Sequence, residues 1–319
     1  MLLRFYAAAL LLAAAGCAMG PPPAPTPAPN AVVPAQTTPP PLNPAYRGVP
    51  GFDTRAYPGD AVMQAWLATS PYRWVGYYLP APCHTDATWV GRRAALERMG
   101  WGTAVIFAGE QDWGAAATVS GPSTAAAAQS PRCTRGNLTA ERGSADAAAA
   151  DSAAAAEGFP VGSTIYLDVE RVDSVSTPLA TYVREWIGAL LAGGRFRPGL
   201  YAHARNADSL RAIQQTELAR RGLAGNGRFW VAGSAAATAG TPAPSAAQAP
   251  AAPAPGSPSV ATSPAPGAFD LSAAPAQSGL PYATIWQGAH DARQSWAGTT
   301  LRIDVDVAAS RSPSAPDSR

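Results

Sequence analysis

Short stretches in which apolar and polar residues alternate recur along this chain, and this two-residue period predicts β-strands. The clearest lies at 163–170, where one face is apolar and the other ends in Asp168 and Glu170. A helix-like segment follows it, so we expect the strand to be covered on both faces. Two carboxylates at the end of such a strand need a reason, because charged side chains are rarely buried without a partner or a function.

The same pattern recurs often enough to predict a closed sheet. Strands are expected at 47–53, 73–79, 103–107, 163–170, 199–203, 229–232, 282–287 and 301–306. Helical patterns follow the first five strands, at 61–68, 88–99, the second half of 115–156, 179–191 and 206–221. Repeated strand–helix units favour a parallel sheet, and eight strands favour a barrel. We therefore expect an α/β fold, an irregular TIM-type barrel of about eight parallel-like strands with helices mainly after the first five.

Three further segments have little apolar surface to bury and are expected to be disordered. They are a Pro-rich tether at 18–45, an Ala/Pro/Ser/Gly insertion at 234–278 and a polar tail at 310–319. One barrel domain at 46–309, interrupted by the insertion, accounts for the rest. About 200 residues remain in it, which is enough for one core.

The N-terminus has the pattern of an export signal. A positively charged start and an apolar run too short to span a bilayer predict a signal peptide at 1–17. Small residues precede Cys17, which resembles the lipobox of bacterial lipoproteins, so we expect lipidation of Cys17 and a membrane anchor. Ordinary cleavage near Gly16 or Ala18 is the alternative. The expected location is periplasmic or extracytoplasmic, on the outer membrane or elsewhere in the cell envelope.

Cysteine and charge content narrow the chemistry. Cys83 and Cys133 are expected to form a disulfide that closes a loop of about 50 residues and contributes roughly 4 kcal/mol, with two free thiols as the alternative. Neither has the spacing of a zinc ligand, so we expect no metal and no cofactor. The net charge is +2 and the chain has no lysine. A nucleic-acid partner is not expected, because it would need clustered basic residues.

Carboxylates recur at the expected mouth of the barrel, where barrel enzymes place their chemistry. They end the first, fourth and last strands, as Asp53, Asp168 with Glu170, and Asp304 with Asp306. First and last strands are neighbours in a closed barrel, so we expect Asp53 and Asp304 to lie close together, across from the fourth-strand pair. Like charges this close raise one another's pKa, which can keep one carboxyl protonated near neutral pH.

The fourth-strand pair suits cleavage of a glycosidic bond. Two residues along a strand lie about 7 Å apart at Cα, which puts their carboxyl groups about 5–6 Å apart, near the spacing of retaining glycosidases. One acid can then protonate the leaving oxygen while the other stabilises or attacks C1. The alternative is that Asp168 and Glu170 cap the next helix or pair with Arg171.

Aromatic and amide side chains at the same strand ends are candidates for binding sugar rings, which stack on flat apolar faces. They are Tyr78, Tyr201, Trp230, Trp286 and Gln287. For each aromatic residue the alternative is packing in the core. A catalytic triad and a histidine metal site are not expected, because no nucleophile elbow or ligand spacing accompanies His84, His203 and His290.

Six short motifs occur in the order in which a known family has them. They are Gly51-Phe-Asp-Thr54, Trp74-Val-Gly-Tyr-Tyr-Leu79, Ile165-Tyr-Leu-Asp-Val-Glu170, Gly199-Leu-Tyr201, Ile285-Trp-Gln287 and Ile303-Asp-Val-Asp306. From Tyr46 to about Ala308 the chain therefore resembles the bacterial glycoside-hydrolase-like family of unknown function numbered 1906, which is related to the family 25 lysozymes. The resemblance implies an irregular barrel of five β/α units and three further strands.

The resemblance also implies roles for the acids. Glu170 matches the general acid of the lysozymes. Asp168 matches the neighbouring acid, which orients the substrate N-acetyl group or stabilises the oxocarbenium-like centre. Asp53 and Asp304 match the flanking acids. The chain departs from the lysozymes at Asp306, where they tend to carry Asn.

We therefore expect a surface-anchored glycoside-hydrolase-like protein that acts on cell-wall glycan, with peptidoglycan as the leading substrate. As an enzyme it would be of the lysozyme, or N-acetylmuramidase, type. Two alternatives stay open: a non-catalytic glycan-binding or envelope-organising lipoprotein with the same barrel, and a barrel whose acids are only structural. The sequence indicates neither the linkage cleaved nor the oligomeric state.

Overall fold

The computed structural model describes residues 47–113, 133–234 and 269–317. The expected signal peptide at 1–17, with Cys17, and the expected tether at 18–45 lie outside the described residues. So does most of the expected insertion at 234–278. Within the described ranges, no helix is both long enough and apolar enough to cross a membrane.

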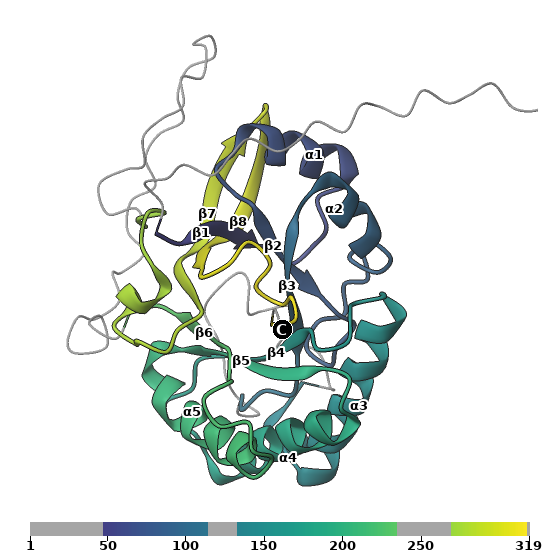
Figure 1. Cartoon of the computed structure of the whole chain (residues 1–319), viewed down its shortest axis with the longest axis vertical. Coiled ribbons are helices and arrows are strands. Elements are labelled where there is room, and N and C mark those ends of the chain that lie inside the picture. Colours follow the sequence, from purple (N-terminus) through teal and green to yellow (C-terminus); the bar gives the residue numbers. More distant parts are fainter. Residues whose placement is uncertain (1–46, 114–132, 235–268, 318–319) are drawn as a thin grey trace, which may run out of the picture. The chain divides into compact units, whose positions relative to one another are not determined.

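Eight strands close into a barrel in which each strand pairs with the next in sequence, as Figure 1 shows. They are β1 (Val49–Asp53), β2 (Trp74–Tyr78), β3 (Gly102–Ala108), β4 (Thr164–Val169), β5 (Arg197–His203), β6 (Phe229–Ala232), β7 (Ile285–Trp296) and β8 (Thr299–Ala308). The expected α/β barrel is confirmed. Its strands are parallel from β1 to β7, but β8 runs antiparallel to both β7 and β1, a direction that the sequence pattern does not indicate.

Helices follow the first five strands, as the sequence predicts. They are α1 (Asp60–Thr69), α2 (Arg93–Met99), α3 (Ala140–Ala156), α4 (Thr177–Gly193) and α5 (Ala204–Ala219). The helix expected at 88–99 begins only at Arg93. The preceding residues form turns, because the Asp86 carboxylate accepts hydrogen bonds from the backbone N–H and hydroxyl of Thr88, and Gly91 has a positive φ of 77°.

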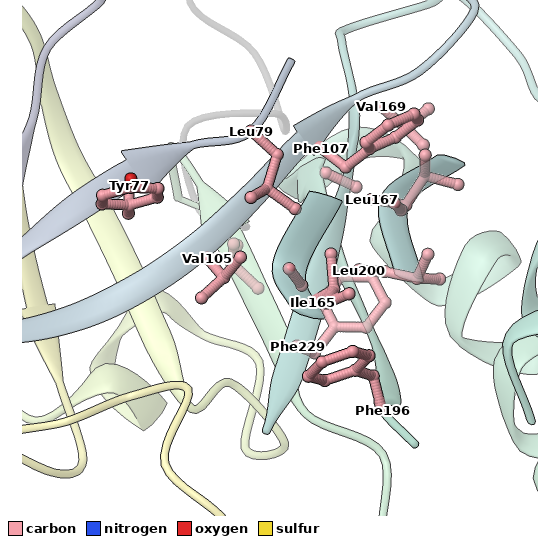
Figure 2. Packing of buried hydrophobic residues seen from close by; sticks show 14 of the residues in the cluster. Tyr77, Leu79, Val105, Phe107, Ile165, Leu167, Val169, Phe196, Leu200 and Phe229 are labelled. Atoms are coloured by element: carbon pink, nitrogen blue, oxygen red, sulfur yellow. The ribbon is translucent and has the colours of Figure 1, made fainter. Parts of the chain in front are cut away.

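The apolar faces of the strands pack outward against the helices. On β4 the outward residues Ile165, Leu167 and Val169 are at most 1% exposed, and Figure 2 shows them beside Phe107 of β3 and Leu200 of β5. Burial of each such side chain contributes about 1.5–3 kcal/mol. The apolar half of the 163–170 pattern therefore forms the core, and its polar half points into the barrel.

Aromatic rings fill the barrel below its mouth. Trp230 meets Trp74 and Tyr166 edge to face, with ring centroids 5.6 and 5.8 Å away. Glycines make room for this layer and for the acid above it. A Cβ at Gly51 would lie 2.1 Å from the Trp74 ring, and a Cβ at Gly76 would lie 2.5 Å from Cβ of Asp53.

The C-terminal segment closes the amino-terminal end of the barrel. The backbone N–H of Ser314 donates to the Thr103 carbonyl, and the Ser314 carbonyl accepts from the Thr164 N–H. Its buried hydroxyl accepts from the Val105 N–H at 2.7 Å. The expectation of a disordered tail at 310–319 is therefore wrong for 310–317, because unpaired strand-end backbone groups bind this segment although it has little apolar surface.

The end of the expected insertion is also ordered. Phe269 meets the Trp286 ring edge to face at 4.7 Å, and the 3-10 helix η3 (Pro275–Ser278) buries Ser278. The expectation of disorder across 234–278 is thus wrong for 269–278. The Phe269 ring supplies packing that the Ala/Pro/Ser/Gly composition of the segment does not predict.

β7 and β8 continue as a long antiparallel hairpin, the pair of yellow arrows in Figure 1. Both strands are longer than the expected 282–287 and 301–306. Two register shifts in β7, after Gln287 and Ala289, interrupt the two-residue alternation. The sequence pattern therefore does not predict the part of the strand after Gln287. Ala297 and Gly298, both with positive φ, make the turn.

We expect Ser314→Ala to lower the free energy of unfolding by about 1–3 kcal/mol, because it leaves the buried Val105 N–H without its acceptor. Ser312→Ala is the matched control in the same segment and should change stability by no more than about 0.5 kcal/mol. Denaturant unfolding measures both. Equal stability of the two variants would show that the segment contributes nothing through this bond.

Candidate active site

A pocket with about 310 Å³ of open space lies at the carboxyl ends of the parallel strands. Its walls bring together most of the residues that the sequence singled out, with one residue from each of the eight strands and one from just after β4. They are Asp53, Tyr78, Ile106, Asp168, Glu170, Tyr201, Trp230, Gln287 and Asp304. Asp53 and Asp304 are direct cross-strand partners, as expected for first and last strands.

The direction of β8 changes how its two acids lie. The sequence placed Asp304 and Asp306 at the carboxyl end of a parallel strand. Because β8 is antiparallel, the chain runs inward from the mouth, and Asp304 lines the pocket from the middle of the strand. Asp306 lies deeper, is 0% exposed, and accepts a hydrogen bond from Trp230 Nε1 at 3.1 Å.

Two of the pocket acids are tied to polar side chains. The Tyr78 hydroxyl donates to Asp53 Oδ1 at 2.7 Å. Gln287 Nε2 donates to Asp304 Oδ2 at 2.8 Å and to Asp53 Oδ2 at 3.4 Å. The Tyr201 hydroxyl donates to Gln287 Oε1 at 2.6 Å and so fixes the amide in this orientation. Asp53 and Asp304 are therefore held by one hydrogen-bonded frame.

The β7–β8 hairpin adds a histidine that the sequence assigned to a loop without a role. His290 lies on β7, and its Nδ1 is 3.7 Å from Asp304 Oδ2. The hydrogen bond with Asp304 raises the pKa of His290. The Asp291 backbone N–H donates to the other oxygen of Asp304 at 2.6 Å. In the sequence, the signal for this contact is that a hairpin can bring together two residues fourteen positions apart, such as His290 and Asp304. The register shifts in β7 interrupt the strand pattern that would reveal the hairpin.

The other two pocket acids have carboxylates that no described side chain binds. The Asp168 carboxylate accepts no hydrogen bond within the described part of the chain, and one of its oxygens is buried. Among the described residues, the Glu170 carboxylate accepts a hydrogen bond only from the backbone N–H of Arg171. Their backbones are nevertheless fixed, because Gln111 Nε2 donates to the Asp168 carbonyl at 2.9 Å and Gln111 Oε1 accepts from the Glu170 N–H at 3.0 Å.

Gln111 is a functional candidate that the sequence analysis missed. Its side chain is 1% exposed and follows β3, the neighbour of β4. A run of polar residues directly after a buried strand was the available signal. The alternative, that the two fourth-strand acids cap the next helix or pair with the Arg171 side chain, does not appear among the described contacts, and the side chain that caps α4 is Ser176.

Burial and mutual repulsion hold protons on the cluster. Burial is the largest cause that raises the pKa of Asp168, and the charges of Glu170, Asp53 and Asp304 add to it. Burial and then Asp304 raise the pKa of Glu170, while His290 lowers it. Burial and Asp304 likewise raise the pKa of Asp53. The pocket therefore contains carboxyl groups that keep a proton at higher pH than exposed ones.

The expected disulfide between Cys83 and Cys133 is present and lies beside the mouth. It joins the loops after β2 and β3. His84, next to Cys83, stacks on Tyr78 with ring centroids 4.4 Å apart. Burial lowers the pKa of His84 to about 4, so this ring is neutral at physiological pH and serves as an apolar support for Tyr78.

Trp286 does not line the pocket, unlike the other sugar-binding candidates. Adjacent strand residues face opposite sides, so Gln287 points inward and Trp286 outward, where its Nε1 donates to the Gly233 carbonyl at 2.7 Å. Trp230 and Tyr201 form an aromatic wall, with ring centroids 5.5 Å apart. Among the described residues, no three His, Cys, Asp or Glu side chains are arranged to hold a metal ion.

Known structures with a similar arrangement include three of bacterial proteins. An uncharacterized B. stearothermophilus protein has 18% identity and a TM-score of 0.46, with 82% of this chain and 96% of that chain covered. The Clostridium perfringens spore cortex lytic enzyme SleM has 12% identity and a TM-score of 0.48, with 83% and 68% covered. The Mycobacterium tuberculosis Tat-secreted protein Rv2525c has 15% identity and a TM-score of 0.41, with 81% and 94% covered.

No curated protein sequence matches this chain. A family model described as "Rv2525c-like, glycoside hydrolase-like domain" matches residues 64–308, from α1 to the end of β8. The match includes every pocket residue except Asp53. The chain therefore belongs to the Rv2525c-like, glycoside hydrolase-like family.

Proposed function

We propose that this barrel hydrolyses a glycosidic bond in cell-wall glycan, with Glu170 and Asp168 as the reacting pair. One observation carries the proposal. Of the four acids in the pocket, two are bound by Tyr78 and Gln287, while the Asp168 and Glu170 carboxylates, at the carboxyl end of β4, receive no hydrogen bond from a described side chain. Carboxylates that react with a ligand must not already be bound by other side chains of the protein.

The two roles are taken from the resemblance to the family 25 lysozymes, because burial and like charges raise the pKa of both acids. Glu170 lies just past the end of β4, and its raised pKa favours the protonated form that a general acid needs. It would give its proton to the leaving glycosidic oxygen. Asp168, as a carboxylate, would stabilise or attack the positive centre at C1. Asp53 and Asp304 would keep the pocket negative and sustain the proton on Glu170.

The shape of the pocket suits a sugar ring. Tyr201 and Trp230 offer aromatic surface beside the acids, and sugar rings stack on such flat apolar faces. Peptidoglycan is the substrate that fits an exported protein of this family. A lipid on Cys17 would hold the enzyme on the envelope surface near that substrate.

Conservative substitution of either reacting acid should reduce turnover without loss of the fold. We expect Glu170→Gln and Asp168→Asn to lower the rate of reducing-end release from purified sacculi by about 10²–10⁴-fold. Asp173→Asn is the matched control, because it removes a fully exposed carboxylate from the loop after the same strand, and it should retain the wild-type rate.

Two outcomes would contradict this assignment. If Glu170→Gln released reducing ends as fast as wild type, Glu170 would not be the acid. If wild type bound sacculi but released nothing, the barrel would be a glycan-binding protein without turnover.

The pH profile of kcat/KM should respond to the two charges beside Glu170. A raised pKa means that Glu170 keeps its proton to higher pH than the ordinary value of about 4.3, and activity is lost as pH rises through it. Asp304→Asn removes the neighbour that raises this pKa, so the alkaline limb should move to lower pH. His290→Gln removes the neighbour that lowers it, so the limb should move to higher pH.

Opposite movements of the alkaline limb in these two variants would identify Glu170 as the titrating acid. A limb that stays in place in both, or moves the same way in both, would assign the titration to another group.

A further inference from the structure

The hydrogen-bond donors that line the pocket are all used within the protein. The Tyr78 and Tyr201 hydroxyls donate to Asp53 and Gln287. The two N–H groups of the Gln287 amide go to Asp53 and Asp304. In a separate contact, Trp230 Nε1 donates to Asp306 below the pocket. The side chains that remain free toward a ligand, those of Asp168 and Glu170, offer acceptors.

The pocket also lacks a positive charge. None of the residues that line it is Arg, Lys or His. His290, 3.7 Å from Asp304 and outside the lining, is the nearest described partner of opposite charge, and its charge also acts on Asp53 and Glu170. Among the described pocket acids, Asp168 has no cation acting on it, an arrangement that costs free energy when a carboxylate leaves bulk water.

We propose that the ligand supplies the missing charge, and that the site selects a sugar with a free ammonium group, as in de-N-acetylated stretches of a glucosamine-containing glycan, over its N-acetylated form. This inference deepens the proposed function, since it rests on the pocket being the sugar site. An ammonium brings three donors and one positive charge to a wall of acceptors. An acetamido group brings one N–H donor and no charge, and among the described pocket side chains only a carboxyl proton is free to bind its carbonyl oxygen.

Asp168 is the acid best placed to receive the ammonium. Its carboxylate has no hydrogen-bond partner among the described residues, and one oxygen is buried. Its charge is opposed by those of Glu170, Asp53 and Asp304. Asp168→Asn removes the charge and introduces an amide donor in nearly the same volume. That change should therefore weaken binding of the amine and leave the acetamide with a partner for its carbonyl.

Proton release is a second signature of the same interaction. The free pocket holds protons, because burial and like charges raise the pKa of Asp53, Asp168 and Glu170. A bound ammonium lowers these pKa values and expels protons into the buffer. A neutral N-acetylated sugar has no such effect. Isothermal titration calorimetry in two buffers of different ionisation enthalpy measures the number released.

The test compares a glucosamine tetrasaccharide with its fully N-acetylated counterpart, with cellotetraose as a sugar that has neither group. We expect wild type to bind the amine about 10–100-fold more tightly than the other two, with proton release for the amine alone. Asp168→Asn should lose about tenfold or more of the amine affinity and none of the N-acetyl affinity. Asp173→Asn should behave as wild type.

Equal or tighter binding of the N-acetylated sugar, no binding of either, or an amine preference that survives in Asp168→Asn would overturn the inference. Its failure is distinguishable from failure of the proposed function. Hydrolysis of sacculi together with a preference for the N-acetylated sugar would refute the inference alone. An amine preference without hydrolysis would refute the proposed function and leave the inference standing.

Discussion

Closure of the barrel by an antiparallel last strand is the constraint on which the site depends. Pairing of β8 with β1 sets Asp304 directly opposite Asp53, and pairing of β8 with β7 sets Asp306 opposite Gln287. Alternate residues of every strand must face the interior, so closing the sheet forces these acids into one small space. The acidic pocket is therefore a consequence of the hydrogen bonding that completes the barrel.

The protein compensates this crowding with neutral donors instead of cations. Tyr78, Tyr201 and Gln287 hold Asp53 and Asp304 in fixed positions, and the frame leaves the two acids of β4 unbound. The tied acids form a rigid negative surface that raises the pKa of the free ones. The same arrangement would serve both the proposed general acid and the proposed attraction for a positively charged sugar.

The fold and most of the pocket could be predicted because a two-residue period reports which side chains share a face. That was enough to place the β4 acids inside and near those of the first and last strands. The period does not report strand direction, so the antiparallel β8 was missed. A shift of one residue separates Gln287 from Trp286, which is why one lines the pocket and the other does not. Gln111 and Ser314 lie in segments without any period and act through backbone groups.

The most direct measurement is time-resolved proton NMR of a defined peptidoglycan oligosaccharide incubated with the wild-type protein. Hydrolysis by Glu170 and Asp168 predicts new reducing-end anomeric signals that first appear with the configuration of the bond cleaved, because attack of a second acid on C1 gives retention. Absence of new reducing ends would contradict catalysis at this pocket, and a first product of inverted configuration would contradict Asp168 as the second acid.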